Sequence, residues 1–329
     1  MYIELLRRFD KRKKVIWQEF LKTAGLSCDE DVKETVLLWD NDCLIGTGSR
    51  DGNLLKLIAI SPEHQGEDLT SLLLSELTKG AFSEGYNHLF LYTKPENEKM
   101  FQSLFFYTVA KTENVLLMEN RKNGINDFLA EISEKNSDGI IGSIVMNANP
   151  FTLGHRFLIE TASKKCDKLY VFVVSEDKSL FSSFDRIEMV KLGTEDLANV
   201  IVLPTGPYLV SSATFPTYFL KEREKASEVQ CLLDVEIFLK YFVPSFSISC
   251  RFVGTEPLSP TTNLYNEALK RCLNNSGIKV FEIPRLQKNG DVISASRVRE
   301  LLVHGEAEDV ESLVPSTTFK YLKSKGFFH

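Results

Sequence analysis

A short stretch in the middle of the chain joins an apolar strand to an amphipathic helix through a loop of small and polar residues. The apolar run Ile140–Met146 is typical of a buried parallel strand. After the loop Asn147–Gly154, Leu158 and Ile159 mark the apolar face of a helix that opens near His155. A strand, a loop and a helix in this order predict a layered α/β domain for this part of the chain.

The start of this helix has the properties of a phosphate-binding site. Its first N–H groups have no partner within the helix and carry a partial positive charge, which favours an anion. Gly154 allows a phosphate to approach the backbone. His155 adds a donor that can follow charge onto a leaving phosphate. The alternative is an ordinary turn in which His155 only caps the helix.

A second helix start lies near the end of the chain. Ser294 or Ser296 is a natural N-cap, and Val298 and Leu301 begin the apolar stripe of the helix that follows. Arg299 therefore lies off the buried face, within about a turn of the helix start. Hydroxyls, N–H groups and an arginine at one helix start are suited to gripping a triphosphate. The alternative is a plain capped helix.

The two helix starts together resemble the signatures of the nucleotidyltransferase superfamily. Thr152–His155 is similar to the Thr-x-Gly-His signature, and Ile293–Arg299 is similar to Ile-Ser-Ser-Thr-x-x-Arg, with Ala295 and Ser296 in place of the usual Ser and Thr. The resemblance implies an enzyme that joins a nucleotide to a second substrate and expels pyrophosphate. It implies nucleotide contacts from residues of both motifs, namely Asn147, Asn149, Pro150, Phe151, Thr152, Gly154, Ser294 and Ser296.

The resemblance also implies roles for residues between the two motifs. Lys178, in the loop after the apolar strand Leu169–Val174, and Arg186, early in the next helix, are expected to serve the phosphates. A solvated loop lysine is the alternative. Gly254 and Thr255 follow a later strand and are expected to contact the nucleotide, unless they form a simple turn. His155, Lys178 and Arg299 are the expected catalytic residues.

Residues 1–125 follow a different pattern. A helix is expected over Lys11–Gly25, then a hairpin at Glu34–Trp39 and Leu44–Gly48, and a strand at Leu54–Ile60 before an amphipathic helix. The remaining expected elements are a strand at His88–Thr93, a helix around Asn97–Leu104, and strands at Phe106–Ala110 and Val115–Glu119. This order resembles the GNAT acyltransferase fold. The expected fold is therefore a GNAT-like α+β domain followed by a Rossmann-like, parallel-sheet nucleotidyltransferase domain.

The loop before the central helix of the first domain departs from the GNAT pattern. Gln65 and Gly66 are similar to the part of that loop that holds the pyrophosphate of acetyl-CoA, but Glu67 and Asp68 follow them. A carboxylate at close range repels a pyrophosphate. We therefore expect a domain that serves as a docking platform and not as an acetyltransferase. The predicted boundaries are residues 1–125 for this domain, 126–138 for a polar linker and 139–329 for the adenylylating domain.

The composition excludes several classes of protein. The net charge of −6 argues against nucleic acid or an anionic membrane surface as a partner. The six cysteines form no Cys-x-x-Cys pair and no zinc-like spacing with the five histidines, so no protein-bound metal is expected. The charged start of the sequence lacks the apolar core of a signal peptide, and no apolar run is long enough to cross a bilayer. A cytoplasmic protein with reduced thiols is expected.

The combination of the two domains resembles the citrate lyase ligase family along nearly the whole chain. The residues that carry the likeness are Asn147–His155, Phe252–Glu267 and Ile293–Arg299. The resemblance implies that ATP, acetate and the thiol prosthetic group on the acyl carrier subunit of citrate lyase give AMP, pyrophosphate and the acetyl thioester. Magnesium is expected as a bridge between phosphate oxygens. The basic cluster between Arg7 and Lys14 is a candidate docking surface for the carrier, or else a solvated face.

Three other functions fit parts of the pattern. An adenylyltransferase would make a dinucleotide-like product and release no AMP, but such an enzyme does not need the first domain. An N-acetyltransferase with a degenerate nucleotide domain is disfavoured by Asp68 and by the intact Gly154–His155 and Ser296–Arg299 pieces. A non-catalytic nucleotide sensor would bind ATP without turnover.

Overall fold

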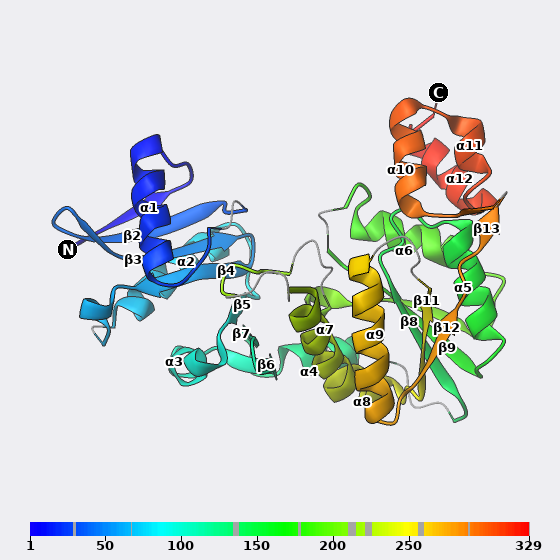
Figure 1. The fold of residues 1–329 in the computed structure, drawn as a ribbon, viewed down its shortest axis with the longest axis horizontal. Coiled ribbons are helices and arrows are strands. Elements are labelled where there is room, and N and C mark those ends of the chain that lie inside the picture. The colour runs from blue at the N-terminus through cyan, green and yellow to red at the C-terminus, as the bar shows by residue number, and fades with distance from the viewer. Residues whose placement is uncertain are drawn as a thin grey trace. The chain divides into compact units, whose positions relative to one another are not determined.

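The chain folds into two compact units in a computed structural model (Figure 1). The structure describes residues 1–28, 31–66, 68–133, 138–176, 179–209, 215–220, 226–255, 260–288 and 290–328. Unit 1 comprises Met1–Gly124 and Pro216–Val229, and unit 2 comprises Ile125–Phe215 and Gln230–His329. The boundaries at 125 and 138 stay a prediction, which did not include the return of the chain to unit 1 after Phe215.

Unit 1 is built on a seven-stranded mixed sheet of order β1-β2-β3-β4-β5-β7-β6. Only the β4–β5 pair is parallel, and the other neighbours are antiparallel. The strands are β1 (Tyr2–Leu6), β2 (Glu34–Asp40), β3 (Cys43–Asp51), β4 (Leu54–Ile60), β5 (Phe90–Thr93), β6 (Tyr107–Lys111) and β7 (Leu116–Glu119). This arrangement agrees with the GNAT-like α+β fold expected from the sequence. Strand β1 was not predicted from the sequence.

Two helices cover the two faces of this sheet. Helix α1 (Lys11–Thr23) places the indole Nε1 of Trp17 3.0 Å from Thr47 Oγ1, to which it donates a hydrogen bond. The next residue on β3, Gly48, lies against leucines of α2 (Leu69–Ser83). Successive strand residues face opposite sides, so α1 and α2 lie on opposite faces. Unit 1 also contains α3 (Glu98–Ser103) and two short 3-10 turns, Pro62–His64 and Pro95–Asn97.

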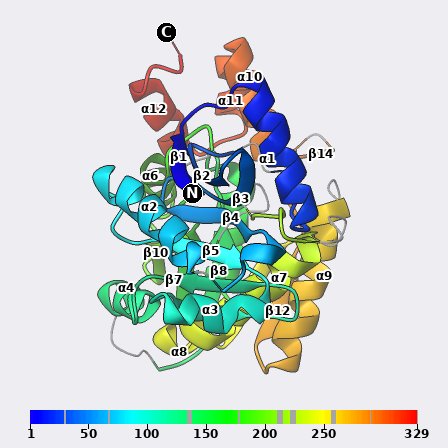
Figure 2. The ribbon, with the colours of Figure 1, turned by 90° about the vertical axis from the view of Figure 1, so that its left-hand side faces the viewer.

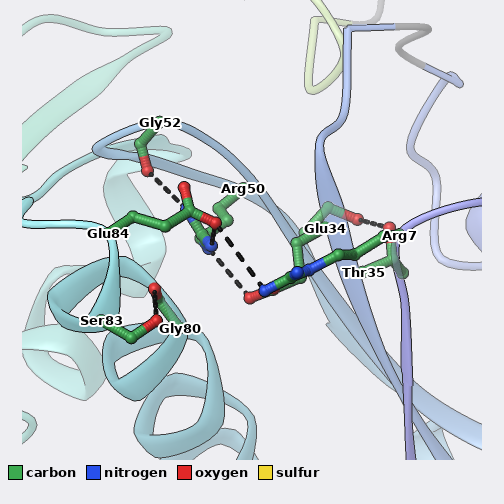
Figure 3. Close-up of polar contacts among 9 residues, drawn as sticks. Arg7, Glu34, Thr35, Arg50, Gly52, Gly80, Ser83 and Glu84 are labelled. Carbon is green, nitrogen blue, oxygen red and sulfur yellow. Dashed lines mark hydrogen bonds and ion pairs between the residues drawn. The ribbon is translucent and has the colours of Figure 1, made fainter.

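A buried arginine links β2, β3 and the end of α2. The Arg50 side chain is fully buried, and its Nε donates to Glu34 Oε1 at 2.9 Å while Nη2 donates to Glu84 Oε1 at 2.6 Å (Figure 3). Arg7, from the basic N-terminal cluster, reaches the other oxygen of Glu34 at 3.4 Å. A buried charge is tolerated only when it is paired and hydrogen-bonded, and here carboxylates and the Gly52 carbonyl satisfy the guanidinium.

Unit 1 contains a cavity of about 620 Å³ beside the parallel strand pair. Strands β4 and β5 pair only at Leu54 and Leu55, and residues of both strands line the cavity beyond that point. Gln65, Gly66 and Asp68 also line it. Asp68 adopts a left-handed conformation (φ 55°) and makes no side-chain cap to α2.

Unit 2 is built on a five-stranded parallel sheet of order β10-β9-β8-β11-β12. Its strands are β8 (Ile141–Met146), β9 (Lys168–Val173), β10 (Val200–Pro204), β11 (Cys250–Gly254) and β12 (Lys279–Ile283). The chain winds outward in one direction from β8 and in the other direction from β11. In sheets of this kind, ligands bind at the carboxyl ends of the strands where the order reverses. The predicted Rossmann-like fold class is confirmed.

Helices pack on both faces of the parallel sheet. Apolar residues of α5 and α6 share one core with Ile144, Val171 and Phe252 of the strands. On the opposite face, Phe172 of β9 contacts the rings of Phe242 and Phe246. The helices described along this part of the chain are, in sequence order, α4 (Gly124–Ile132), α5 (Leu153–Ser163), α6 (Ser183–Leu192), α7 (Ala226–Ile237), a π-helical turn (Phe238–Phe242), α8 (Val243–Phe246) and α9 (Pro260–Asn275).

The last part of unit 2 is a cluster of three helices, α10 (Ala295–His304), α11 (Ala307–Glu311) and α12 (Ser316–Ser324), seen together in Figures 1 and 2. A small hairpin of β13 (Gln287–Lys288) and β14 (Asp291–Val292) precedes them. Asp185 of α6 fastens α12, because it accepts a hydrogen bond from Tyr321 at 2.7 Å and pairs with Lys325 at 2.8 Å. None of the helices in the described ranges is both long enough and apolar enough to cross a membrane.

Gly80 of α2 lies against the buried Arg50–Glu34 ion pair, so the protein should be less stable to unfolding when a side chain is added at this position. A Cβ at position 80 would overlap Glu34 Oε1, which is held in place by Arg50. Gly80→Ala should therefore lower the free energy of unfolding by about 1–3 kcal/mol, although the same change in an unhindered helix raises it by roughly 0.5–1 kcal/mol. Urea unfolding measures the effect, with Ser75→Ala at an exposed position of α2 as the control. Stabilisation by Gly80→Ala would contradict the packing.

Candidate active site

The first motif lies at the carboxyl end of β8, where the loop 147–152 leads into α5. Thr152 is the N-cap of α5, and its Oγ1 accepts a hydrogen bond from the backbone N–H of His155 at 3.4 Å. In return, His155 Nδ1 accepts from the backbone N–H of Thr152 at 3.1 Å. Each residue therefore satisfies a backbone donor of the other, with His155 in the position that glutamate usually takes in such a capping box. His155 does cap the helix, but with one ring nitrogen only.

This cap fixes the tautomer of His155. Because Nδ1 accepts a hydrogen bond from a backbone N–H, the proton of the neutral ring is on Nε2. Burial, and then the charge of Arg285, lower the pKa of His155 to about 4. The ring is therefore a neutral donor at physiological pH. It stacks on Phe151, with 5.9 Å between the ring centroids and 15° between the planes.

The second motif begins the helix α10. Ser294 is its N-cap, with Oγ accepting from the backbone N–H of Arg297 at 3.2 Å, so the structure chooses between the two candidate caps. Ser296 has a different role, since its Oγ accepts a hydrogen bond from Arg299 Nη2 at 3.0 Å. The hydroxyl and the guanidinium are thus held next to each other in the first turn of the helix.

The two motifs meet. Arg299 Nη1 donates to the backbone carbonyl of Asn149 at 2.7 Å, across 150 positions of sequence. A Cβ on Gly154 would lie 3.2 Å from the carbonyl oxygen of Ile293, the residue before the Ser294 cap. From the sequence, Gly154 was predicted to make room for a phosphate, whereas in the structure its neighbour is Ile293 of the second motif. We call the Arg299–Asn149 bond and the Gly154–Ile293 contact the clasp.

The residues before Thr152 form the framework of the first loop. Asn149 is nearly buried, and its Oδ1 accepts from the backbone N–H of Phe181 at 3.2 Å. Phe151 is fully buried, and the peptide bond between Asn149 and Pro150 is cis. Asn147 Nδ2 donates to Ser179 Oγ at 3.4 Å. These contacts fix the loop that presents Thr152 and His155.

Arg186 has a role that differs from the one expected. Its side chain is fully buried, and Nη1 donates to Asn147 Oδ1 at 2.6 Å and to the Val174 carbonyl at 2.7 Å. Nε donates to the Phe181 carbonyl at 3.1 Å. The hydrogen bonds of the Arg186 guanidinium therefore hold the loops after β8 and β9 in place, which is a structural role and not the phosphate contact that was predicted. Lys178 lies outside the described residues, so its role stays a prediction.

The loop after β11 contacts Arg285, a residue that was not predicted from the sequence as part of the site. The Gly254 carbonyl accepts from Asn266 Nδ2 at 3.1 Å, and the backbone N–H of Thr255 donates to the Ile283 carbonyl at 2.9 Å. Thr255 Oγ1 accepts from the backbone N–H of Arg285 at 3.1 Å, and Arg285 Nε donates to the Thr255 carbonyl at 2.8 Å. The sequence did contain a signal for Arg285, because it lies two residues after the end of β12. Ligands bind at the carboxyl ends of the strands in parallel sheets, so a charged residue at that place is a candidate for ligand binding.

The described residues include no group of three or more His, Cys, Asp or Glu side chains placed to hold a metal ion.

The protonation of His155 can be tested directly. Across the range from about pH 4 to 6.5 the folded protein should keep this ring neutral while the unfolded chain binds a proton. His155 therefore makes the fold lose stability as the pH falls from about 6.5 to about 4, with no further loss below that. NMR titration of the five histidine rings, with His155 assigned from its substitution, should give a pKa near 4. An ordinary value near 6.5 would contradict the site geometry.

The chain is similar to known proteins over nearly its whole length. Residues 141–322 match the family model "Citrate lyase ligase C-terminal domain". The chain is similar to citrate (pro-3S)-lyase ligase of Klebsiella pneumoniae, with 40% identity over 97% of this chain and 95% of the relative, and to the same enzyme of Escherichia coli, with 37% identity over 97% and 93%. It is also similar to phosphopantetheine adenylyltransferase of Clostridium botulinum, with 48% identity over 40% of this chain and 74% of the relative. The chain belongs to the citrate lyase ligase family.

Proposed function

We propose that the protein is an ATP-dependent acid–thiol ligase. It activates acetate as acetyl-adenylate and transfers the acetyl group to the thiol prosthetic group on the acyl carrier subunit of citrate lyase. The observation that carries the proposal is the clasp, which brings two helix starts together at the carboxyl edge of a parallel sheet, and helix starts are suited to binding anions. The names of the relatives support citrate lyase as the target.

In the first step, an acetate oxygen attacks the α-phosphorus of ATP. The bond from the α-phosphorus to the bridging oxygen breaks, and pyrophosphate leaves with the electron pair. Negative charge spreads over the phosphates, so the step depends on positioning and on fixed donors more than on a base. His155 Nε2–H is the donor placed for this charge. Because the ring is already neutral, it donates without first losing or gaining a proton.

Other residues of the two motifs hold the phosphates in this proposal. Ser296 and Arg299 grip the β- and γ-phosphates at the start of α10, with their mutual hydrogen bond fixing the geometry. Thr152 is buried and bonded to the His155 ring, so it acts by orienting that ring. Lys178 is proposed to neutralise the leaving pyrophosphate. Magnesium enters with the ATP, as a bridge between phosphate oxygens.

In the second step, the carrier thiolate attacks the acetyl carbon. The bond from that carbon to the phosphate oxygen breaks, and AMP leaves with the electron pair, while the thiol proton passes to solvent. This release of AMP separates the proposal from an adenylyltransferase, whose dinucleotide-like product retains the AMP. The similarity to phosphopantetheine adenylyltransferase makes that reaction the second candidate.

The full-length protein and His155 variants test the proposal together. With ATP, magnesium and acetate, the wild type should exchange labelled pyrophosphate into ATP, and it should release AMP once the carrier is added. His155→Ala should lower the exchange rate on the order of a hundredfold or more, the usual scale for one preorganised donor. No acetate-dependent exchange by the wild type would refute the acid–thiol ligase.

A second variant separates the two roles of His155. In His155→Asn the amide oxygen can accept from the Thr152 N–H and keep the cap, but no donor reaches the position of Nε2. It should fold as the wild type does and still lose the exchange activity. Near-normal exchange by folded His155→Asn would show that the histidine only caps α5.

A further inference from the structure

Arg285 follows β12 and stands at the same edge of the sheet as the two motifs. The residue after it, Leu286, accepts a hydrogen bond at its carbonyl from the backbone N–H of Ile293 at 3.1 Å. Ile293 in turn packs its carbonyl against Gly154, the residue before His155. A short path of backbone contacts therefore connects Arg285 to the start of α5 as well as to the start of α10.

Thr255 fixes the position of Arg285. The hydroxyl of Thr255 accepts from the backbone N–H of Arg285 at 3.1 Å, and the Thr255 carbonyl accepts from its Nε at 2.8 Å. The ends of β11 and β12 are joined as well, by the bond from the Thr255 N–H to the Ile283 carbonyl. These bonds fix the direction of the Arg285 side chain, and a pre-organised planar guanidinium is the form in which arginine binds phosphate well.

A cation close to the phosphates of ATP would stabilise their negative charge in the proposed site. A triphosphate brings several negative charges into a protein whose net charge is −6. His155 donates a hydrogen bond but is neutral, so other groups must balance the charge of the phosphates. The charge of Arg285 is felt at the His155 ring, where it disfavours protonation and so lowers the pKa.

We propose that Arg285 is a polyphosphate-binding residue of the ATP site, which holds the phosphates beside His155 while pyrophosphate departs. This rests on the proposed function, and it adds a cation from a segment outside both motifs. Thr255 then serves as the positioning residue for Arg285. It accepts hydrogen bonds from both the backbone N–H and the side-chain Nε of this arginine.

The test uses pyrophosphate as the probe, because its binding needs no turnover. Calorimetry of the full-length protein with magnesium pyrophosphate should show affinity weakened about tenfold or more in Arg285→Met, the scale of a lost charge-assisted hydrogen bond. Arg285→Lys should recover part of the affinity. In the exchange assay, the KM for ATP should rise in Arg285→Met while the KM for acetate stays within about twofold.

Arg156→Met is the matched control. Arg156 follows His155 in α5 and carries the same charge, and its guanidinium donates to Asp196 at 2.7 Å and to the Gly193 carbonyl at 2.7 Å, beyond the C-terminal end of α6. Its loss should leave the affinity for pyrophosphate unchanged. Unchanged affinity in folded Arg285→Met, or a rise in the KM for acetate alone, would overturn the assignment. Loss of the proposed function is a separate outcome, since it would appear as no acetate-dependent exchange by the wild type.

Discussion

The bond from Arg299 to the Asn149 carbonyl is the interaction on which the site depends. A hydrogen bond from a charged group contributes about 1.5–3 kcal/mol, roughly twice the contribution of a neutral one. Here it joins the loop after β8 to the first turn of α10, and the contact of Ile293 with Gly154 brings the same two segments together a second time. Without this clasp, α5 and α10 would each present an ordinary capped helix start, and neither alone has the donors and charge that a triphosphate requires.

In the proposed ATP site, hydrogen bonding and charge are assigned to different residues. The cap on α5 sets the His155 tautomer and leaves a neutral Nε2–H donor, while the proposal assigns the positive charge to arginines on other segments. A neutral donor can follow charge through the reaction without a change of protonation. Arg186 belongs to neither group, because it is buried beneath the loops and keeps them in place.

The sequence predicted the elements whose signals are local. The strand before Asn147, the helix start at His155 and the cap near Ser294 all follow from neighbouring residues, and the structure has them where they were expected. Interactions over long distances in the sequence were not predictable in this way. Nothing near Gly154 indicates that Ile293 packs there, and nothing near Arg186 indicates that carbonyls of two loops surround it. The return of Tyr218 to unit 1, where its hydroxyl donates to the Tyr92 carbonyl at 2.7 Å, is equally non-local.

A crystal structure of the protein with magnesium and a non-hydrolysable ATP analogue tests the central claim most directly. The account predicts phosphates bound between the first turns of α5 and α10, within hydrogen-bond distance of His155 Nε2 and Arg299, with the Arg299–Asn149 bond retained. A nucleotide bound away from these helix starts, or a structure in which the two segments face apart, would contradict it.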